Sequence, residues 1–312
     1  MPWSERIRRR FKLRDLHILL AVARMGSMGR AAAALSISQP AVSKAITDLE
    51  QALDVRLFER TRQGTEPTSS GRALLKAGIA VFDVLRQGLE EMDFLSDPTV
   101  GELRIGCHEP LITGFVATVI DELTRRFPRV TVQVMPGDAV SLNYALHQRD
   151  IELTIVPTLG LEVDRDTEAE VLFDDRHVIV AAAISKWARR RKMMLTELES
   201  EPWVLPPAES IAGRYIDDAF RSAGLEPPSA RVSSFSIPLH HHLLATGRYV
   251  TSLPRSLLQF APHLQLKQLP VAWPAKRRPV AILTLKSRAL SPLAESFAGQ
   301  VRQFAKSSGL AH

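Results

Sequence analysis

The 312-residue sequence predicts an α plus α/β fold with a small N-terminal helical domain, a long helix and a larger two-lobed α/β domain. Two short capped helices followed by a hairpin pattern predict the first part, and apolar residues at heptad spacing predict the long helix. Strand patterns that alternate with helical patterns predict the third part. Because the length exceeds that of a usual single core, we expect two or three domains, and the patterns divide the chain into four segments. They are a basic arm at 1–12, the helical domain at 13–71, the linker helix at 72–98 and the α/β domain at 101–306.

The helical domain is predicted from periodicity and capping residues. A first helix should run from Leu13 to Gly26, and Ser27 and Ser38 can cap two further helices that are separated by a tight turn. In the last helix one narrow sector is apolar and the opposite face is polar. The apolar sector holds Val42, Ile46, Leu49 and Leu53, and the opposite face holds Pro40, Lys44, Thr47 and Gln51, with Ser43 on its flank and Gln39 in the first turn. Such a face can lie close to base edges in a major groove, although an ordinary amphipathic hairpin with a solvated face is the alternative.

A hairpin wing should follow the third helix. Residues 56–68 lose the helical period and gain threonine, glycine and proline. Arg60 and Arg62 fall at the base and tip of this hairpin, where an arginine reaches backbone phosphate or a minor groove.

The charge distribution favours nucleic acid as the partner of this domain. Residues 1–72 hold 13 Lys and Arg against 7 Asp and Glu, whereas the remaining 240 residues hold 27 of each. The whole formal net charge of +6 therefore lies in the segment that contains the helical pair. A basic module on a neutral body is typical of a protein that binds the phosphate backbone with one end.

The segment from Leu13 to Gly71 resembles the winged helix-turn-helix domain of the LysR-type transcriptional regulators. The resemblance is carried by Ala31-Ala32, Ser38-Gln39-Pro40-Ala41-Val42-Ser43-Lys44, Leu49-Glu50, Leu57-Phe58-Glu59-Arg60 and Thr68 with Gly71. Three residues depart from the family pattern. Asp54 occupies a position that is usually Gly, Gln63 one that is usually Arg, and Pro67 one that is usually an aliphatic residue of the wing. The resemblance implies binding to double-stranded DNA and a regulatory effect on RNA polymerase. It implies DNA contacts by Met28, Arg30, Ser38, Gln39, Pro40, Ala41, Ser43, Lys44, Thr47, Arg60 and Arg62.

The linker helix carries two interleaved apolar series seven residues apart. One series is Leu75, Phe82 and Leu89, and the other is Gly78, Leu85 and Met92. Such a seam calls for a partner helix, either from a second chain or from a later part of the same chain. The resemblance implies that this helix dimerises through Leu75, Phe82, Leu85, Leu89 and Met92, in a homodimer or homotetramer.

The C-terminal two-thirds predict an α/β domain with two lobes. Strands are expected at 103–107, 130–134, 152–156, 177–183, 203–205, 231–234, 249–253 and 280–285. Helices are expected at 113–127, 141–149, 214–223, 239–246 and 292–306. The pattern resembles the periplasmic-binding-protein-like effector domain of the LysR-type family, which implies a small-molecule effector between the lobes. Ligands in open α/β sheets bind beyond the carboxyl ends of strands.

The order of the strands predicts which residues line that cleft. They are Cys107, His108, Glu109, Pro110, Gly137, Asp138, Pro157, Thr158, Ser210, Ile211, Ser236 and Ile237. Because Glu109 and Asp138 are acidic, this mouth is not an obvious trap for carboxylates. Cys107, the one cysteine, is a candidate thiol sensor, but a small buried residue is the more ordinary interpretation.

No catalytic, metal or cofactor motif is found in the sequence. It lacks the nucleophile elbow, the P-loop, the dinucleotide-binding glycine pattern and the zinc-protease motif. His240-His241-His242 point in three directions on a helix, and Arg189-Arg190-Arg191-Lys192 is expected to be a solvated surface run. Neither a secretion signal nor an apolar run of membrane-spanning length occurs, which favours the cytoplasm and argues against an exported solute-binding protein. An α/β enzyme with an accessory DNA-binding domain is the remaining alternative. It would need a catalytic nucleophile and base, and the sequence shows no such pair.

Overall fold

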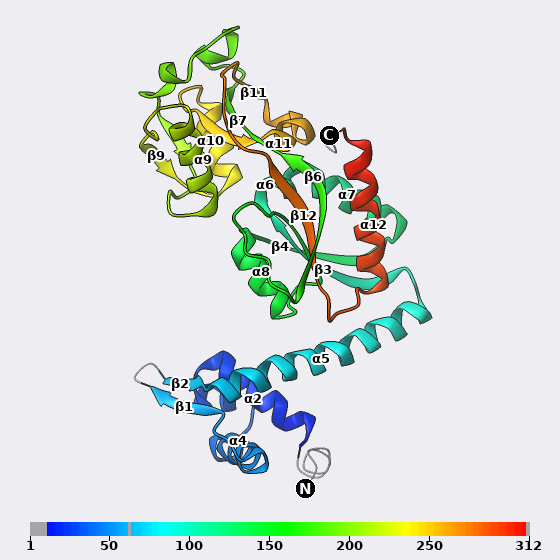
Figure 1. The fold of residues 1–312 in the computed structure, drawn as a ribbon. Coiled ribbons are helices and arrows are strands. Elements are labelled where there is room, and N and C mark those ends of the chain that lie inside the picture. Colours follow the sequence, from blue (N-terminus) through cyan, green and yellow to red (C-terminus); the bar gives the residue numbers. More distant parts are fainter. Residues whose placement is uncertain (1–10, 62–63, 310–312) are drawn as a thin grey trace. The chain divides into compact units, whose positions relative to one another are not determined.

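The computed structural model describes residues 11–61 and 64–309. The basic arm up to residue 10, Arg62 and Gln63 lie outside the described residues, so the roles expected for them stay predictions. The chain divides into two compact units, residues 1–89 and 90–312 (Figure 1).

The first unit contains the three predicted helices, α2 (Leu13–Met25), α3 (Met28–Ala34) and α4 (Gln39–Leu53). Gly26 ends α2 in the left-handed conformation, with φ 61°, and its N–H donates to the carbonyl of Val22. The hydroxyl of Ser27 accepts the N–H of Arg30, and the hydroxyl of Ser38 accepts the N–H of Ala41. Both predicted N-caps are therefore confirmed.

The core of this unit fixes the orientation of α4. Val42, Ile46 and Leu49 are buried against residues of α2 and α3, as the helical period predicts. After α4 the chain turns at Asp54 with φ 56°, a conformation that explains why glycine suits this position. The wing follows as the antiparallel strands β1 (Phe58–Thr61) and β2 (Gly64–Pro67).

The linker helix α5 (Ser69–Ser96) has two faces with different environments. Leu75 and Phe82 pack against the core of their own unit, and the ring of Phe82 lies 5.8 Å from that of His17. Both side chains are only partly buried by helices of the same chain, so the expectation that they form an intersubunit seam stays a prediction. The exposed apolar side chains of α5 are Val81, Val84, Leu85, Leu89, Met92 and Leu95.

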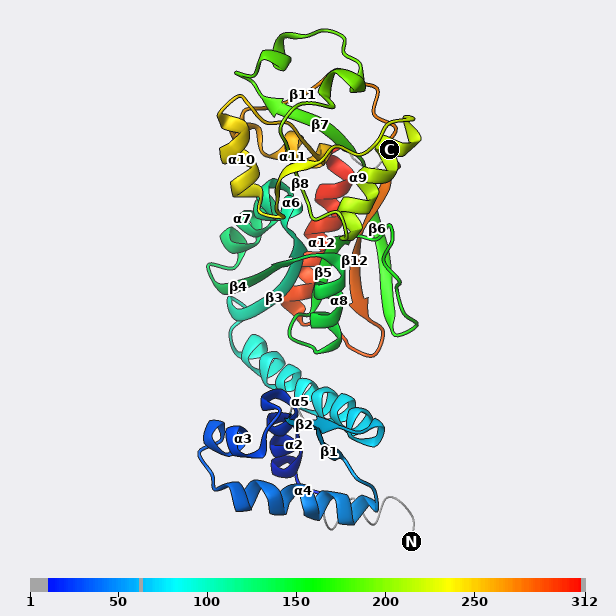
Figure 2. The same ribbon diagram turned by 90° about the vertical axis from the view of Figure 1, so that its left-hand side faces the viewer.

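The second unit begins with a lobe built on a mixed five-stranded sheet. The order is β4 (Arg129–Gly137), β3 (Val100–His108), β5 (Leu153–Pro157), β12 (Arg278–Leu285) and β6 (Thr167–Asp175). β3 pairs parallel with β4 and β5, whereas β12 is antiparallel to both of its neighbours. Helices α7 (Ala117–Arg126) and α12 (Pro292–Ser307) cover one face, and α8 (Ala139–His147) covers the other (Figures 1 and 2).

The helix expected at 113–127 is interrupted. α6 (Glu109–Leu111) leads into a π-helical turn at Ile112–Val116, in which Thr113 and Gly114 are not helical. Gly114 has φ 125°, and a Cβ atom built there would lie 2.6 Å from the Cβ of Phe260 in α11 (Arg255–Phe260). The break thus depends on a contact with a distant segment, so helical periodicity alone could not reveal it.

The second lobe is built around β7 (His177–Ala182), which lies between β10 (Thr251–Pro254) and β11 (Leu266–Gln268). A second, parallel pair consists of β8 (Trp203–Leu205) and β9 (Ala230–Ser233). Buried residues of α9 (Ile211–Ser222) pack in one core with Ile179, and those of α10 (Ile237–Ala245) and α11 in another with Val178. The sequence did not predict α11, β6 or β11.

Two strands connect the lobes. β6 ends at Asp175 in the first sheet and β7 begins at His177 in the second, so one residue separates them. β12 returns the chain to the first sheet, where Arg278 pairs with Asp175 in the strand ladder. The whole second lobe is therefore an insertion between two strands of the first.

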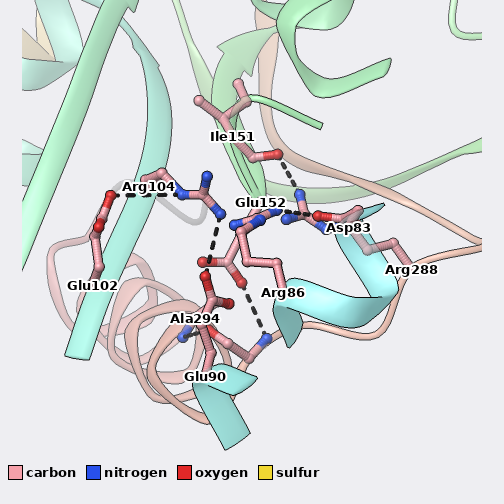
Figure 3. A network of polar contacts seen from close by, with 10 residues as sticks. Asp83, Arg86, Glu90, Glu102, Arg104, Ile151, Glu152, Arg288 and Ala294 are labelled. Carbon is pink, nitrogen blue, oxygen red and sulfur yellow. Dashed lines mark hydrogen bonds and ion pairs between the residues drawn. The ribbon is translucent and has the colours of Figure 1, made fainter. Parts of the chain in front are cut away.

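Polar contacts connect several charged side chains within the second unit (Figure 3). Arg104 of β3 forms ion pairs with Glu90 at 3.5 Å and with Glu102 at 3.8 Å. A carboxylate oxygen of Glu152 accepts the N–H of Ser291 at 3.1 Å, and Arg288 donates to the carbonyl of Ile151.

None of the helices in the described residues is long and apolar enough to cross a membrane.

Candidate DNA-binding surface and effector cavity

The outer face of α4 is free of packing within the described unit. Ser38, Gln39, Pro40, Ser43, Lys44 and Thr47 are exposed, and Ala41 is partly exposed. On α3, Arg30 is exposed and Met28 is partly buried against the core. The exposed side chains combine hydroxyl, amide and ammonium groups, which are the groups that read base edges and phosphates. The predicted face of the helix is thus the accessible one.

Glu50 links α4 to the wing, a role that sequence reasoning missed. Its Oε1 accepts the backbone N–H of Leu57 at 2.8 Å and that of Phe58 at 3.3 Å. Oε2 lies 3.4 Å from Nη1 of Arg56. Arg60 is exposed on β1, where it pairs with Thr65 of β2. The position of the wing is therefore coupled to the helix through one carboxylate.

Between the two lobes of the second unit lies a cavity of about 380 Å³. Its walls come from the ends of strands, from the starts of α6, α8 and α10, and from loops of the second lobe. The lining residues are His108, Glu109, Pro110, Pro136, Gly137, Asp138, Ser141, His177, Pro206, Ala212, Ser234, Phe235, Ile237, His240, Ser252, Leu253 and Pro254. This size suits a small molecule.

The structure places six of the twelve predicted residues in this wall, namely His108, Glu109, Pro110, Gly137, Asp138 and Ile237. Pro157 lines a smaller adjoining space. The other five do not line the cavity, and the prediction for them is wrong: Cys107, Thr158, Ser210, Ile211 and Ser236.

The misplaced residues have structural roles that explain their positions. Thr158 donates to the carbonyl of Pro279, and the hydroxyls of Ser210 and Ser236 accept N–H groups at the starts of α9 and α10. Ile211 follows Ser210 as the first residue of α9. Cys107 is fully buried in the core of the first lobe, and burial raises the pKa of its thiol. A thiol that stays protonated and covered is a poor redox sensor.

Two histidines of the wall are held neutral. Burial and the charge of Arg278 lower the pKa of His108 to about 4. The same two causes, in the same order, lower the pKa of His177 well below its usual value. His177 accepts a bond from Nη1 of Arg278 at 3.1 Å through Nε2, so its Nδ1 carries the proton and donates to Ser252 at 3.1 Å.

A buried polar cluster lies behind His177 where the strands cross between lobes. Arg278 is buried, stacks over the ring of Tyr215 at 4.8 Å, and has its pKa lowered by burial. Asp175 accepts the hydroxyl of Ser256 at 2.5 Å, and burial raises the pKa of its carboxyl. The guanidinium is thus engaged with His177 and Tyr215, and it borders the smaller space that adjoins the cavity.

Comparison with known proteins assigns the family. The family model for the LysR substrate binding domain matches residues 96–306, and the one for the bacterial regulatory helix-turn-helix protein, lysR family, matches residues 13–72. The chain belongs to the LysR family of transcriptional regulators. As a LysR-type regulator it has a helix-turn-helix DNA-binding domain and an effector-binding domain.

The sequence similarity to individual relatives covers most of this LysR-type regulator. It is 32% identical to the transcriptional regulator TfdS of Cupriavidus pinatubonensis over 256 residues, covering 79% of this chain and 83% of TfdS. It is 28% identical to the regulator GbpR of Azospirillum brasilense, covering 95% of this chain and 87% of GbpR.

Solved structures confirm the fold. A full-length OxyR variant from Pseudomonas aeruginosa matches with a TM-score of 0.65 and 19% identity, over 96% of each chain. CbnR in complex with its target DNA matches with a TM-score of 0.63 and 21% identity, over 94% of this chain and 100% of that one. The order of helix-turn-helix, linker helix and two α/β lobes is therefore that of a full-length LysR-type protein.

Proposed function

We propose that this regulator reads its operator with the exposed face of α4 in the major groove and with the wing against the DNA backbone. The observation that carries the proposal is the separation of the two faces of α4. One face is buried in the core, while the other presents Ser43, Lys44 and Thr47 without any competing packing. In helix-turn-helix proteins the helix in this position supplies the base contacts. Arg60, together with Arg62 outside the described residues, would add phosphate contacts.

We further propose that two chains assemble through the exposed apolar face of α5. Leu85, Leu89 and Met92 are 47%, 62% and 63% exposed on a single helix. A continuous apolar stripe on a soluble helix calls for a partner helix. A dimer also brings two copies of α4 to the DNA, which multiplies the affinity for two half-sites.

The cavity between the lobes is the proposed effector site. A ligand there can change DNA binding only by the difference between its affinities for two arrangements of the lobes. Because β6 and β12 both cross between the lobes, a change at the cavity can alter the angle between them. The coupling must be reciprocal, so operator DNA should change effector affinity by the same factor.

The proposal also places the protein in the cytoplasm and assigns it no enzymatic activity. The relatives named above are transcriptional regulators.

Selection of DNA from a random-sequence pool by the full-length protein tests this assignment. We expect enrichment of a motif with two half-sites, since a dimer contacts two. The parent protein and a Ser43→Ala, Lys44→Ala, Thr47→Ala variant should then be compared by gel shift on the enriched site. The variant should lose preference for the motif, and an unchanged preference would contradict the placement of α4. Glu122→Gln, on the exposed face of α7, is the matched control.

A further inference from the structure

The hydrogen-bonding groups around the cavity are unequally divided between donors and acceptors. The first turn of α10, which would otherwise present N–H groups to an anion, is already occupied. Ile237 donates its N–H to Oε1 of Glu109 at 3.1 Å, across the cleft from the other lobe. Pro238 has no N–H, and the N–H of Leu239 bonds to the hydroxyl of Ser236 at 3.4 Å. This helix start therefore has no spare donor in its first three residues.

Two of the three histidines in the wall have both ring nitrogens engaged with protein atoms. His177 bonds to Arg278 and Ser252, as described above. His240 donates from Nε2 to the carbonyl of Ser234 at 2.8 Å, and its Nδ1 lies 3.3 Å from the hydroxyl of Thr251. These rings shape the wall without offering a free proton to a ligand.

His108 differs, because one of its nitrogens remains open to the cavity. Its Nδ1 lies 3.3 Å from the carbonyl oxygen of Gly137, which can only accept, so the proton of the neutral ring is on Nδ1. Nε2 is then an acceptor, and no partner for it is found in residues 11–61 and 64–309. The ring thus presents a lone pair that a ligand donor can satisfy.

Glu109 and Asp138 add two more acceptors. One oxygen of Glu109 accepts the N–H of Ile237, and one oxygen of Asp138 accepts the N–H of Ser141 at 2.7 Å. Within the described part of the chain, the second oxygen of each carboxylate has no protein donor. No lysine or arginine side chain of that part lines the cavity, and its hydroxyl donors are serines.

The remaining wall is apolar. It is formed mainly by Pro110, Pro136, Phe235, Ile237 and Leu253. A carboxylate ligand would meet two like charges in this wall, which disfavours its binding. The nearest described cation, Arg278, does not line the cavity and already bonds to His177 and stacks over Tyr215. An ammonium group carries three donors and a positive charge, matching the three open acceptors in number and the carboxylates in sign.

We infer that the cavity takes a small molecule with a primary ammonium group on an apolar body, held by His108, Glu109 and Asp138. This inference rests on the proposed effector site and specifies the chemistry of its ligand. It also assigns Glu109 two tasks, because one oxygen caps α10 from the opposite lobe while the other contacts the ligand. Binding of the ammonium group would thereby add to a bond that already joins the lobes.

Matched probes that differ in the charged group test the inference on the full-length protein. The pairs are phenethylamine with 3-phenylpropanoate, benzylamine with phenylacetate, and cyclohexylmethylamine with cyclohexylacetate. Binding is followed by saturation-transfer NMR and by titration calorimetry at pH 7. We expect at least one amine to bind, and to bind at least about tenfold more tightly than its carboxylate partner, since a desolvated charge interaction readily reaches that size.

Two conservative variants assign the contact. Glu109→Gln keeps an oxygen for the N–H of Ile237, and Asp138→Asn keeps a cap for α8, so both should fold like the parent. Each should weaken amine binding at least about fivefold, because it removes one of the two negative charges. Glu122→Gln on α7 is exposed and distant from the wall, so it should leave the affinity unchanged.

The outcomes separate this inference from the proposed function. If the carboxylates bind more tightly, and Phe235→Ala abolishes that binding, the cavity is an effector site for another class and the inference fails alone. If no probe binds, or if amines bind equally well to Glu109→Gln and Asp138→Asn, the inference also fails. In every case the DNA selection decides separately whether the protein is the proposed regulator.

Discussion

Glu50 joins the proposed DNA-reading helix to the wing, and we expect Glu50→Ala to loosen the start of β1. Its carboxylate accepts two backbone N–H groups, from Leu57 at 2.8 Å and Phe58 at 3.3 Å. Leu57 is fully buried, so water cannot replace the lost acceptor without local opening. The side chain of Glu50 is 12% exposed, which limits screening of these bonds by solvent.

The magnitude follows from the two bonds. A hydrogen bond to a charged group contributes about 1.5–3 kcal/mol, and the longer bond should lie at or below the lower end. We therefore expect the free energy of local opening at residues 57–58 to fall by about 2–4 kcal/mol. Since 1.4 kcal/mol is a tenfold change, amide exchange there should accelerate by about 30- to 700-fold. Glu50→Gln keeps one oxygen and should lose about half of this free energy.

Hydrogen–deuterium exchange of the full-length protein, followed by mass spectrometry of peptides covering 50–61, measures this effect. The matched control is Glu59→Ala, because Glu59 is an exposed carboxylate on β1 itself. DNA affinity should fall with Glu50→Ala as the wing loses its fixed position. Exchange at residues 57 and 58 within threefold of the parent would refute the tethering role of Glu50.

Three further outcomes are expected. Lys44→Ala should cost about 1–3 kcal/mol in operator binding and relax preference at one base position, as measured by gel shift with single-base operator variants. Changing Leu85, Leu89 and Met92 together to Glu should reduce the particle mass in light scattering, because unpaired charges in an apolar interface are costly. The thermal midpoint should fall as pH drops from about 6.5 to about 4. In this range His108 is protonated in the unfolded chain but stays neutral in the folded protein, where its pKa is lowered to about 4. His108→Asn should flatten that pH dependence.

Each outcome has a matched control and a contradicting result. Lys306→Ala removes an exposed charge on α12. If it weakens operator binding as much as Lys44→Ala does, the effect of Lys44 comes from net charge and not from a base contact. Ile184→Glu places one charge at a position 72% exposed, and an unchanged mass for the α5 variant would remove the proposed interface. His263→Asn replaces an exposed histidine, and an identical pH profile for His108→Asn and His263→Asn would show that His108 is not the group responsible.

The helical domain could be predicted closely because its signals are local. Ser27 and Ser38 satisfy N–H groups three residues away, and the core face of α4 follows from the helical period alone. The first-lobe wall was predictable for a similar reason, since His108 and Asp138 lie at the ends of strands whose carboxyl ends meet at one edge.

The rest depends on tertiary contacts that a single sequence does not display. Phe235 and Pro206 reach the cavity from loops of the second lobe, and His177 does so from the strand that crosses between lobes. β6 was missed because most of its central residues are exposed, two glutamates among them, although it pairs along its whole length with β12. Leu75 and Phe82 share the apolar period of α5, but they pack against the core of their own domain. Periodicity identifies an apolar face without identifying its partner.

The insertion of the second lobe between β6 and β12 has a consequence for synthesis on the ribosome. β12 lies between β5 and β6, and it is made about a hundred residues after β6. Until it emerges, two strands of the first sheet have exposed edges that can pair with other nascent chains. All residues of the second lobe are synthesised before β12, so the second lobe can fold while the first lobe still lacks this strand. Ribosome-bound chains in which residues up to 277 have left the exit tunnel should therefore show a protease-resistant second lobe beside a cleavable first lobe. Equal resistance of both lobes would contradict this order of folding.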